Sequence, residues 1–406
     1  MAETILIIGA GQTAAQAVET LRDEGFSGRI VLVGAEPYLP YTRTPLSGDI
    51  LAGAAGVASC TVHDEAFYAD RDVTLVLGQR VLGIDRDART VRLDDDRVLR
   101  WNRLLFATGA HARQLGVEGE DLDGVSTLRT RDEAEALRRR LAGARRVVVV
   151  GGGWIGLQAT ATAHAAGCEV TLVEAAEHLL PRVAAPEVAL VVRVFHATRG
   201  VRVICGSRVN GFTGRDGRLT AVLTDDDRRL PADLAIVAVG ARPHTELAAA
   251  VGLEVRDGIV VDAAGRTSDP GIFAAGDCTR FFSPPLGRSV RLESWRNARR
   301  QARVVARALA GDESARFDEI PYVHSDQGTM HIDVIGAPEA WDQVMMRGTP
   351  WIPDCTAVML DHGVVVGGAS FNRPDDMVPV EALIRAHARP DPRALLDPSI
   401  PLADLV

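Results

Sequence analysis

The sequence predicts an α/β protein with two parallel-sheet domains built on one plan, followed by a smaller α+β domain. An apolar run, a glycine-rich turn, a helical segment and a second apolar run ending in an acid occur near residue 4 and again near residue 146. Beyond Gly311 the pattern changes to alternating, strand-like runs. A chain of 406 residues is long enough for two or three such domains.

The first repeat occupies residues 4–36. In a dinucleotide-binding turn, Gly9 would make the tight bend, Gly11 would let a pyrophosphate approach the backbone, and Ala14 would pack the helix against the strand. Glu36 ends the second strand and would accept hydrogen bonds from a ribose hydroxyl. Tight strand-to-helix turns need glycine whether or not they bind anything. Here the strand before the turn, the helix after it and the acid downstream all stand where a dinucleotide-binding motif has them, so we expect a nucleotide site in a Rossmann-like domain.

The second repeat begins with the apolar residues 146–150. Its turn is a complete G-x-G-x-x-G formed by Gly151, Gly153 and Gly156, and Glu174 follows the next strand, 23 residues after the first glycine. Because this pattern occurs for a second time in one chain, it predicts a duplicated module with two dinucleotide sites rather than one large sheet.

The segments between and after the glycine turns predict the remaining architecture. Residues 37–48 contain too much proline for a helix or a central strand and should form a loop. Three β-like runs, residues 73–77, 81–85 and 90–93, are expected to form an antiparallel meander. Residues 104–110 should return to the parent sheet as a buried strand.

The second half repeats some of these features. Residues 235–241 echo the pattern of 104–110, and a later apolar run ends in Gly276 and Asp277. An arginine- and alanine-rich helix is expected from Trp295 to about Ala310.

Composition excludes several classes of protein. A net charge of −9 argues against general binding of nucleic acid or anionic membranes. The sequence has no apolar run near the 18 to 20 residues of a membrane span and no basic start typical of a signal peptide, so the cytoplasm is expected. All 45 basic residues are arginine. The five cysteines lack the spacing of a metal or disulfide framework and are expected to be small core residues: Cys60, Cys168, Cys205, Cys278 and Cys355.

Several short motifs in this order resemble the FAD-dependent, NADH-dependent ferredoxin reductases of bacterial oxygenase systems, the putidaredoxin-reductase-like proteins related to apoptosis-inducing factor. The motifs are Gly9-x-Gly11-x-x-Ala14, Pro45-Leu46-Ser47, Ala107-Thr108-Gly109, Gly151-x-Gly153-x-x-Gly156, Gly240-Ala241-Arg242-Pro243, Ala275-Gly276-Asp277, Glu293-Ser294-Trp295 and Ser325-Asp326-Gln327. The resemblance implies a glutathione-reductase-like fold. It comprises a discontinuous FAD domain of residues 1–112 and 236–312, an NAD domain of residues 113–235 and a C-terminal domain of residues 313–406.

The resemblance also implies the cofactor-binding residues. The ADP half and diphosphate of FAD would be held by Gly9, Gly11, Ala14, Glu36, Arg43 and Arg129, the ribityl chain by Asp277, and the flavin ring by the segment at Trp295. NAD would be held by Gly151, Gly153, Ile155, Gly156 and Glu174, with Gly240 at its nicotinamide end. Pro45, Ala107 and Gln158 are further expected cofactor-binding positions. No protein nucleophile and no metal are needed.

Three positions depart from the family pattern. Gly48 and Gln158 replace a lysine and a glutamate that pair beside the flavin in the family, and the joint loss leaves no unpaired buried charge. His324 stands where the family usually has tryptophan, and it is a candidate proton-handling residue. A neutral, hydrogen-bonded His324 that only fills space is an equal alternative.

These departures leave three functions open. The first is hydride uptake from NADH and electron transfer to a small [2Fe-2S] ferredoxin serving an oxygenase. The second is a diverged flavoenzyme that acts directly on a small molecule, with Gly48 making room for it. The third is a slow, nucleotide-bound redox scaffold or sensor. The protein is expected to be a monomer or a homodimer. Arginines between Arg280 and Arg303 would dock an acidic ferredoxin, or would form an ordinary solvated face.

Overall fold

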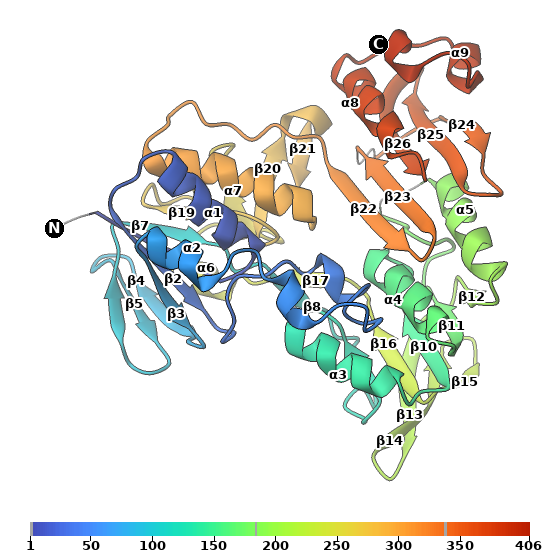
Figure 1. The fold of residues 1–406 in the computed structure, drawn as a ribbon, viewed down its shortest axis with the longest axis horizontal. Coiled ribbons are helices and arrows are strands. Elements are labelled where there is room, and N and C mark those ends of the chain that lie inside the picture. Colours follow the sequence, from blue (N-terminus) through green and yellow to red (C-terminus); the bar gives the residue numbers. More distant parts are fainter. Residues whose placement is uncertain (1–2, 183–184, 337–338) are drawn as a thin grey trace. The chain divides into compact units, whose positions relative to one another are not determined.

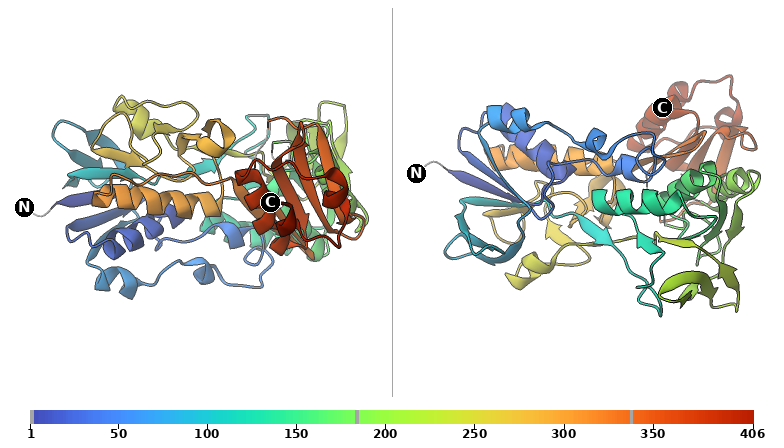
Figure 2. Two further views of the ribbon diagram at one scale, coloured as in Figure 1. Left: turned by 90° about the horizontal axis from the view of Figure 1, so that it is seen from above. Right: turned by 60° about the horizontal axis from the view of Figure 1, so that its bottom comes forward.

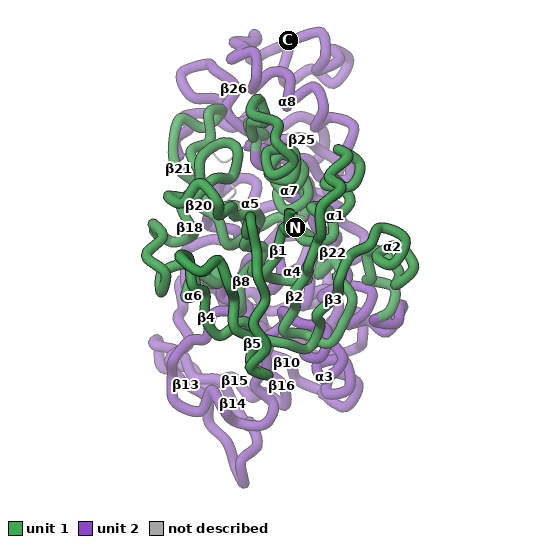
Figure 3. The backbone as a smooth tube through the Cα atoms, turned by 90° about the vertical axis from the view of Figure 1, so that its left-hand side faces the viewer, with its two compact units in different colours: residues 1–43, 58–111, 241–320 green, residues 44–57, 112–240, 321–406 purple. Residues whose placement is uncertain are grey.

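The computed structural model describes residues 3–182, 185–336 and 339–406, and its chain forms two compact units (Figure 3). Unit 1 comprises Met1–Arg43, Ala58–His111 and Ala241–Ile320. Unit 2 comprises Thr44–Val57, Ala112–Gly240 and Pro321–Val406.

Unit 1 is organised around a five-stranded parallel sheet. In spatial order its strands are β19 (Ile272–Ala274), β7 (Arg103–Phe106), β1 (Thr4–Ile8), β2 (Arg29–Gly34) and β3 (Val73–Leu77). Ile8 pairs with Phe106, and Phe106 pairs with Ala274, so the carboxyl ends of three neighbouring strands are level. The residues that follow these strands therefore lie along one edge of the sheet, where open parallel sheets bind ligands.

Two helices lie side by side on one face of this sheet, α1 (Gln12–Asp23) and α7 (Trp295–Ala310) (Figures 1 and 2). Helix α1 buries Ala14, Ala17, Val18 and Leu21, whose spacing of three and four residues places them on one stripe against the sheet. Helix α7 has the predicted bounds. It begins after Ser294, whose hydroxyl accepts from the Asn297 N–H, and ends at Gly311 with φ of +106°.

The expected meander was wrong for its first strand. Strand β3 pairs in parallel with β2, and only β4 (Val81–Asp85), β5 (Thr90–Leu93) and β6 (Val98–Arg100) are antiparallel. The cause is the short helix α2 (Glu65–Asp70), which the sequence analysis missed. It is capped by Asp64, whose carboxylate accepts from the Phe67 N–H. This helix makes the crossover that brings residues 73–77 back parallel to β2.

The rest of unit 1 consists of short elements. Strands β18 (Ile259–Val261), β20 (Thr279–Ser283) and β21 (Arg288–Val290) form a small sheet. A two-stranded sheet joins β8 (Ala110–Ala112) to β17 (Ala241–Pro243), and α6 (Glu246–Ala250) follows β17.

Unit 2 repeats the parallel sheet. Its strands, in spatial order, are β12 (Arg202–Ile204), β11 (Glu169–Val173), β10 (Arg146–Val150), β16 (Leu234–Val237) and β9 (Val125–Thr127). Its helices are α3 (Arg131–Leu141), α4 (Trp154–Ala165) and α5 (Pro186–Ala197). An antiparallel sheet contains β13 (Val209–Arg215), β14 (Arg218–Thr224) and β15 (Arg229–Pro231). Strands β10, β11, β12 and β16 repeat the order of β1, β2, β3 and β7, as the repeated sequence pattern predicts, but the edge strand β9 precedes the repeat in the chain whereas β19 follows it.

Unit 2 also contains an antiparallel sheet near the C-terminus. It is ordered β22 (Tyr322–Gln327), β23 (Met330–Ile335), β26 (Val364–Phe371), β25 (Asp354–Asp361) and β24 (Gln343–Thr349), and it contacts α8 (Met377–Arg385) and α9 (Pro392–Leu396). The buried Gln327 of β22 joins α5 through its Oε1, which lies 2.7 Å from Nε2 of His196. In the described part of the chain, every helix is too short or too polar to cross a membrane.

Candidate nucleotide-binding sites

The turn after β1 has the geometry that a bound pyrophosphate requires. Gly9 has φ of +109°, and a Cβ there would lie 2.2 Å from the Ala107 carbonyl oxygen, so only glycine fits. Gly11 is the N-cap of α1. Among the described residues, no side chain caps this helix and no heavy atom beyond its chain neighbours lies within 4 Å of a Cβ built on Gly11. Ala14 is fully buried under the helix. The arrangement leaves open space at a helix N-terminus, which favours anions.

The neighbouring strand ends bring Ala107 and Asp277 to the same edge of the sheet. Gly276 has φ of +83°, and a Cβ there would lie 2.4 Å from Oγ1 of Thr13 in the first turns of α1. The Gly276 N–H donates to Oε1 of the buried Gln301 at 2.7 Å. These contacts, which the sequence analysis did not predict, fix the backbone of Asp277 beside the start of α1.

Glu36 follows β2 and is held by two neighbours in the next loop. Its Oε2 accepts from the Tyr41 hydroxyl at 2.6 Å, and its Oε1 accepts from Nη2 of Arg43 at 2.9 Å. Burial lowers the pKa of Arg43, but attraction by Tyr41 and Glu36 outweighs burial, so the pKa is raised above its ordinary value. The carboxylate is thus oriented before any ribose arrives, and Arg43 keeps its positive charge.

The other residues expected around FAD are divided between the two units. Trp295, in unit 1, is 39% exposed, and the Arg299 guanidinium lies 4.8 Å from its ring centre. Pro45 and Arg129 belong to unit 2, Pro45 in the short helical turn Thr44–Leu46 and Arg129 just before α3. The backbone N–H of Arg129 donates to Oε2 of Glu133 at 2.6 Å.

The turn after β10 repeats the geometry of the first. Gly151 has φ of +106°, and a Cβ there would lie 2.4 Å from the Ala238 carbonyl oxygen. A Cβ on Gly156 would lie 1.9 Å from the Gly151 carbonyl oxygen, so the third glycine allows close helix packing. Gly153 caps α4 as Gly11 caps α1, again with no capping side chain and with no described heavy atom near its Cβ position except those of its own neighbours. The next helical residue, Ile155, is 42% exposed.

The Glu174 carboxylate accepts two backbone hydrogen bonds beside this second turn. Its Oε2 accepts from the Gly152 N–H at 2.6 Å and its Oε1 from the Ala176 N–H at 2.8 Å. Gly240, beyond the end of β16, has φ of +105°, and its Cβ position lies 3.3 Å from Nη2 of Arg182. No sequence motif identifies Arg182 as a neighbour of Gly240.

Gly48 and Gln158 lie next to each other within unit 2. A Cβ on Gly48 would lie 3.3 Å from Nε2 of Gln158, and the Ser47 hydroxyl donates to Oε1 of Gln158. One turn further along α4, Oγ1 of Thr162 donates to the Ser47 carbonyl at 3.0 Å. The proline-rich loop is therefore attached to α4 by neutral hydrogen bonds, where the family resemblance implies a charged pair.

His324 lies in β22 among other ionisable side chains. Its ring stacks on that of His331 in β23, with ring centres 6.2 Å apart. His331 lies 2.6 Å from Oδ1 of Asp326 through Nδ1 and 3.0 Å from Oδ2 of Asp333 through Nε2. Burial lowers the pKa of His331, but hydrogen bonds and attraction from the two carboxylates outweigh it, so the pKa is raised.

Most of the arginines expected to dock a ferredoxin have acidic partners. Arg291 is nearly buried between Asp257 and Glu293, and Arg296 and Arg300 share Glu319. In α7, Arg303 is the exposed member of the group. The pairing favours the alternative that much of this arginine group is an ordinary charged face.

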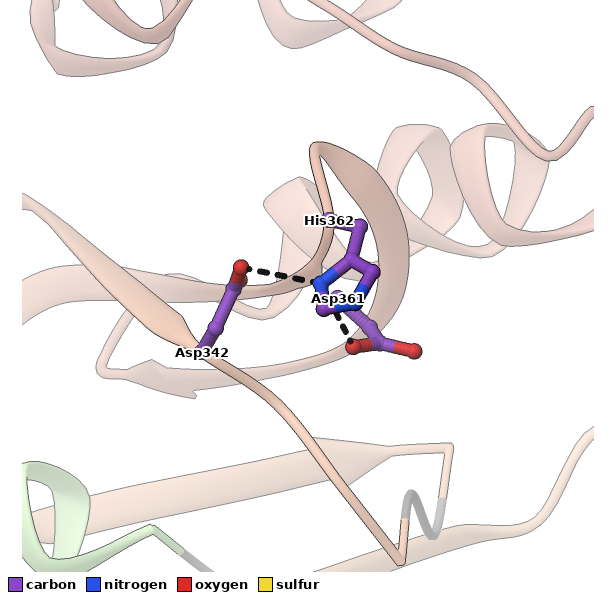
Figure 4. A group of neighbouring side chains, drawn as sticks. All are labelled: Asp342, Asp361 and His362. Atoms are coloured by element: carbon purple, nitrogen blue, oxygen red, sulfur yellow. Dashed lines mark hydrogen bonds and ion pairs between the residues drawn. The ribbon is translucent and has the colours of Figure 1, made fainter.

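A group of three possible metal ligands lies at the β25–β26 turn (Figure 4). Nδ1 of His362 lies 3.2 Å from Asp342 and 3.6 Å from Asp361, and the His362 side chain is 84% exposed. These contacts hold the three side chains together at the surface. All five cysteines are described and have free thiols. Four are buried as expected, whereas Cys205 is only partly buried.

Comparison with known proteins agrees with this geometry. The sequence pattern of the pyridine nucleotide-disulphide oxidoreductases matches residues 3–302, and a reductase C-terminal domain matches residues 322–406. The chain is 37% identical to a ferredoxin--NAD(P)(+) reductase of Sphingomonas sp., covering 99% of this chain and 97% of the relative. It is 37% identical to the putidaredoxin reductase of Pseudomonas putida, covering 100% of this chain and 97% of the relative.

Solved structures show the same similarity. The reductase chain in a covalent putidaredoxin reductase-putidaredoxin complex superposes with a TM-score of 0.95 at 37% identity, covering 99% of this chain and 98% of that one. A ferredoxin reductase from Rhodopseudomonas palustris gives the same TM-score and identity, covering 99% of each chain.

Proposed function

Because the chain belongs to the pyridine nucleotide-disulphide oxidoreductase family, whose members use FAD and NAD(P)H, we propose that it is an FAD-dependent NADH oxidoreductase that reduces a small [2Fe-2S] ferredoxin serving an oxygenase. The observation that carries this proposal is the pair of glycine turns, each with open space at an uncapped helix N-terminus and an oriented acid on the adjacent strand. One dinucleotide binds at each turn.

The residues of each turn have separate roles in the proposal. FAD binds at Gly9, Gly11 and Ala14, with Glu36 on the adenosine ribose. Arg43 and Arg129 bind the diphosphate, Asp277 the ribityl chain, and Trp295, Pro45 and Ala107 contact the flavin half. NAD binds at Gly151, Gly153, Ile155 and Gly156, with Glu174 on its adenosine ribose and Gly240 at the nicotinamide end. Gln158 is a further cofactor-binding residue.

Bound FAD supplies the step from a two-electron donor to one-electron acceptors, because it takes hydride from NADH and can release electrons singly. The protein contributes binding, orientation and electrostatics. Helix N-termini and Arg43 attract the diphosphates, and the two acids fix the riboses. Although the family name refers to disulphides, no described cysteine forms one, and none precedes Cys60 in the sequence. Electrons therefore leave to an acceptor outside the chain.

We extend the proposal to domain organisation and location. Residues 1–112 and 236–312 form the FAD domain, residues 113–235 the NAD domain, and residues 313–406 the C-terminal domain. The protein functions in the cytoplasm, where NADH is available, and five free thiols suit a reducing compartment.

Two measurements test the function. The purified protein should be yellow, with one non-covalent FAD per chain, and NADH should bleach the flavin rapidly in an anaerobic stopped-flow experiment. Protein that binds FAD but bleaches only over minutes would instead be a scaffold or sensor.

One observation favours a second candidate, a flavoenzyme acting directly on a small molecule. Gly48 lacks a side chain beside the neutral Gln158 amide, whereas the family resemblance implies a lysine and a glutamate at these positions, so the place has extra space and no fixed charge. Product analysis with NADH, oxygen and candidate substrates in the absence of ferredoxin separates the two functions.

A further inference from the structure

Residues 179–182 lie against the second glycine turn, although no sequence motif places them there. The Leu180 N–H donates to the Gly152 carbonyl oxygen at 3.0 Å, and Cδ2 of Leu179 lies 2.6 Å from the position of a Cβ on Gly152. Both leucines are only 1% exposed. Two buried residues therefore fix this segment to the turn, and Arg182 follows directly after it in the chain.

The backbone of Leu180 is strained. Its φ of +52° lies in the left-handed region, which bulky residues rarely adopt. Such conformations persist only where the surrounding structure holds them, and they are concentrated at functional sites and ligand clamps. Here the hydrogen bond to Gly152 and the burial of the side chain hold the residue. The position of Arg182 is thus determined by contacts between its segment and the turn.

Arg182 lies at the carboxyl edge of the second sheet, beyond β16. Its Nη2 and Nη1 are 3.3 and 3.8 Å from the position of a Cβ on Gly240, which follows shortly after β16. Because Val150 pairs with both Val173 and Val237, the ends of β11, β10 and β16 are level. The segment that leaves β11 therefore passes the turn after β10 and brings Arg182 to the β16 side.

The Arg182 guanidinium is available to a ligand. Its residue is exposed, and among the described residues no carboxylate lies within the 4.0 Å of an ion pair. By contrast, Arg146 of the same unit pairs with Asp233 at 3.0 Å. A guanidinium offers a planar fork of donors that suits phosphate oxygens, and this one lies close to a helix N-terminus that favours anions.

The order of the strands gives the direction of a bound dinucleotide. In folds of this type the diphosphate lies at the helix N-terminus after the first strand, and the nucleotide extends across the carboxyl edge where the strand order reverses. In this sheet that point lies between β10 and β16. With Glu174 on the adenosine ribose beside β11, the nicotinamide half lies on the β16 side, where Arg182 and Gly240 meet.

We propose that Arg182 binds the phosphate of the nicotinamide mononucleotide half of NADH, and that the absence of a side chain at Gly240 gives its guanidinium room to do so. The inference rests on the proposed function, which places NADH at this turn. The adenosine-side phosphate lies at the N-terminus of α4, beside Gly153. The two phosphates are thus bound by different parts of the chain, a helix N-terminus and a side chain.

Ligands that cannot reduce the flavin distinguish the two phosphates. The oxidised, FAD-loaded protein is titrated calorimetrically with NAD⁺, with ADP-ribose and with AMP. ADP-ribose has both phosphates but no nicotinamide, and AMP has only the adenosine-side phosphate. The dissociation constants therefore report binding without any redox step. Arg182→Gln removes the charge, whereas Arg182→Lys keeps the charge without the planar fork.

Two further variants serve as controls. Arg215→Gln also removes one positive charge from unit 2, at a side chain that is 88% exposed and lies in the β13–β14 hairpin. It should bind all three ligands as the wild-type protein does. Gly153→Val should block the adenosine-side phosphate and abolish the binding of all three. FAD absorbance and Tm are measured for every variant, so that a folding defect is recognised.

Arg182→Gln should raise the dissociation constants of NAD⁺ and ADP-ribose by about tenfold and leave that of AMP nearly unchanged. The loss should shrink as salt is raised, and Arg182→Lys should recover part of it. Equal affinity of the wild-type protein and Arg182→Gln for ADP-ribose would overturn the role of Arg182 while the nucleotide site stands. A loss confined to NAD⁺ would also overturn it, because Arg182 would then contact the nicotinamide. If the wild-type protein binds neither NAD⁺ nor ADP-ribose, the proposed NAD site fails and the role of Arg182 fails with it.

Discussion

A Cβ on Gly48 would lie 3.3 Å from Nε2 of Gln158, so the two positions for which the family resemblance implies a lysine and a glutamate face each other. Both belong to unit 2, where the Ser47 hydroxyl and the Gln158 amide attach the proline-rich loop to α4. Because φ of Gly48 lies outside the left-handed region, a larger residue can adopt its backbone conformation. The two positions are occupied by neutral groups that are hydrogen-bonded to each other's segments.

The first prediction concerns variants that introduce a lysine at position 48 and a glutamate at position 158. Each single variant, Gly48→Lys or Gln158→Glu, places an unpaired charge at a half-buried position, whereas the double variant forms a pair. The double variant should therefore be bleached by NADH faster than the sum of the single effects predicts. Stopped-flow bleaching of the four proteins measures this. Strictly additive effects would mean that the two side chains do not interact at the flavin.

The second prediction tests which cofactor binds at which glycine turn. Since no described heavy atom beyond its chain neighbours lies within 4 Å of a Cβ on Gly11, Gly11→Val should fold normally but block the pyrophosphate of FAD and yield colourless protein. Gly153→Val is the matched control, because its Cβ is equally unobstructed. That variant should keep its FAD and lose NADH binding. Full flavin content in Gly11→Val would show that FAD is assigned to the wrong turn.

The third prediction concerns the choice of nicotinamide cofactor. Glu174 is held by the Gly152 and Ala176 N–H groups, and its negative charge should repel a 2′-phosphate. We expect kcat/KM for NADH to exceed that for NADPH by at least about tenfold, or about 1.4 kcal/mol. Glu174→Gln should narrow the gap. Equal values in the wild-type protein would contradict the role given to Glu174.

The fourth prediction concerns ferredoxin docking. Arg296 and Arg300 already share Glu319, whereas Arg303 of the same helix is exposed. If α7 meets an acidic ferredoxin, Arg303→Glu should weaken the association at low salt, and the effect should fade as salt is raised. Binding measured between about 20 and 200 mM salt tests this. No difference at low salt would identify an ordinary charged face.

The fifth prediction follows from the raised pKa of His331. A raised pKa means that protonation stabilises the folded protein. This stabilisation is complete below the ordinary value of about 6.5 and is lost as the pH rises through the higher folded-state pKa. The Tm should fall by about 1–3 °C over that range. In His331→Gln this fall should disappear. An unchanged pH profile in the variant would show that His331 does not titrate as inferred.

The parts predicted well from sequence are those that local patterns determine. Both glycine turns, their helices and the bounds of α7 follow from apolar spacing, capping residues and glycine conformations that are encoded within a few residues. The pairing partner of residues 73–77 could not be predicted, because it depends on α2, a helix of six residues with little periodicity.

The candidate site likewise combines residues that a local sequence pattern predicts with contacts that no local pattern predicts. Glu36 and Glu174 were found because an acid after the second strand is part of the local pattern. The Arg43–Tyr41 support of Glu36, the Gln301 contact to Gly276 and the position of Arg182 beside Gly240 come from residues distant in sequence or outside any motif. The contacts of His331 with Asp326 and Asp333 depend on strand register, which single residues do not reveal.

The central claim is that electrons pass from NADH through this flavoprotein to a small iron-sulfur protein. The most direct test is anaerobic mixing of catalytic amounts of the FAD-loaded protein with NADH and an excess of oxidised putidaredoxin, followed by absorbance of the [2Fe-2S] cluster. The account predicts rapid reduction with two ferredoxins reduced per NADH consumed. NADH consumption without reduction of putidaredoxin or of a cognate ferredoxin would contradict it.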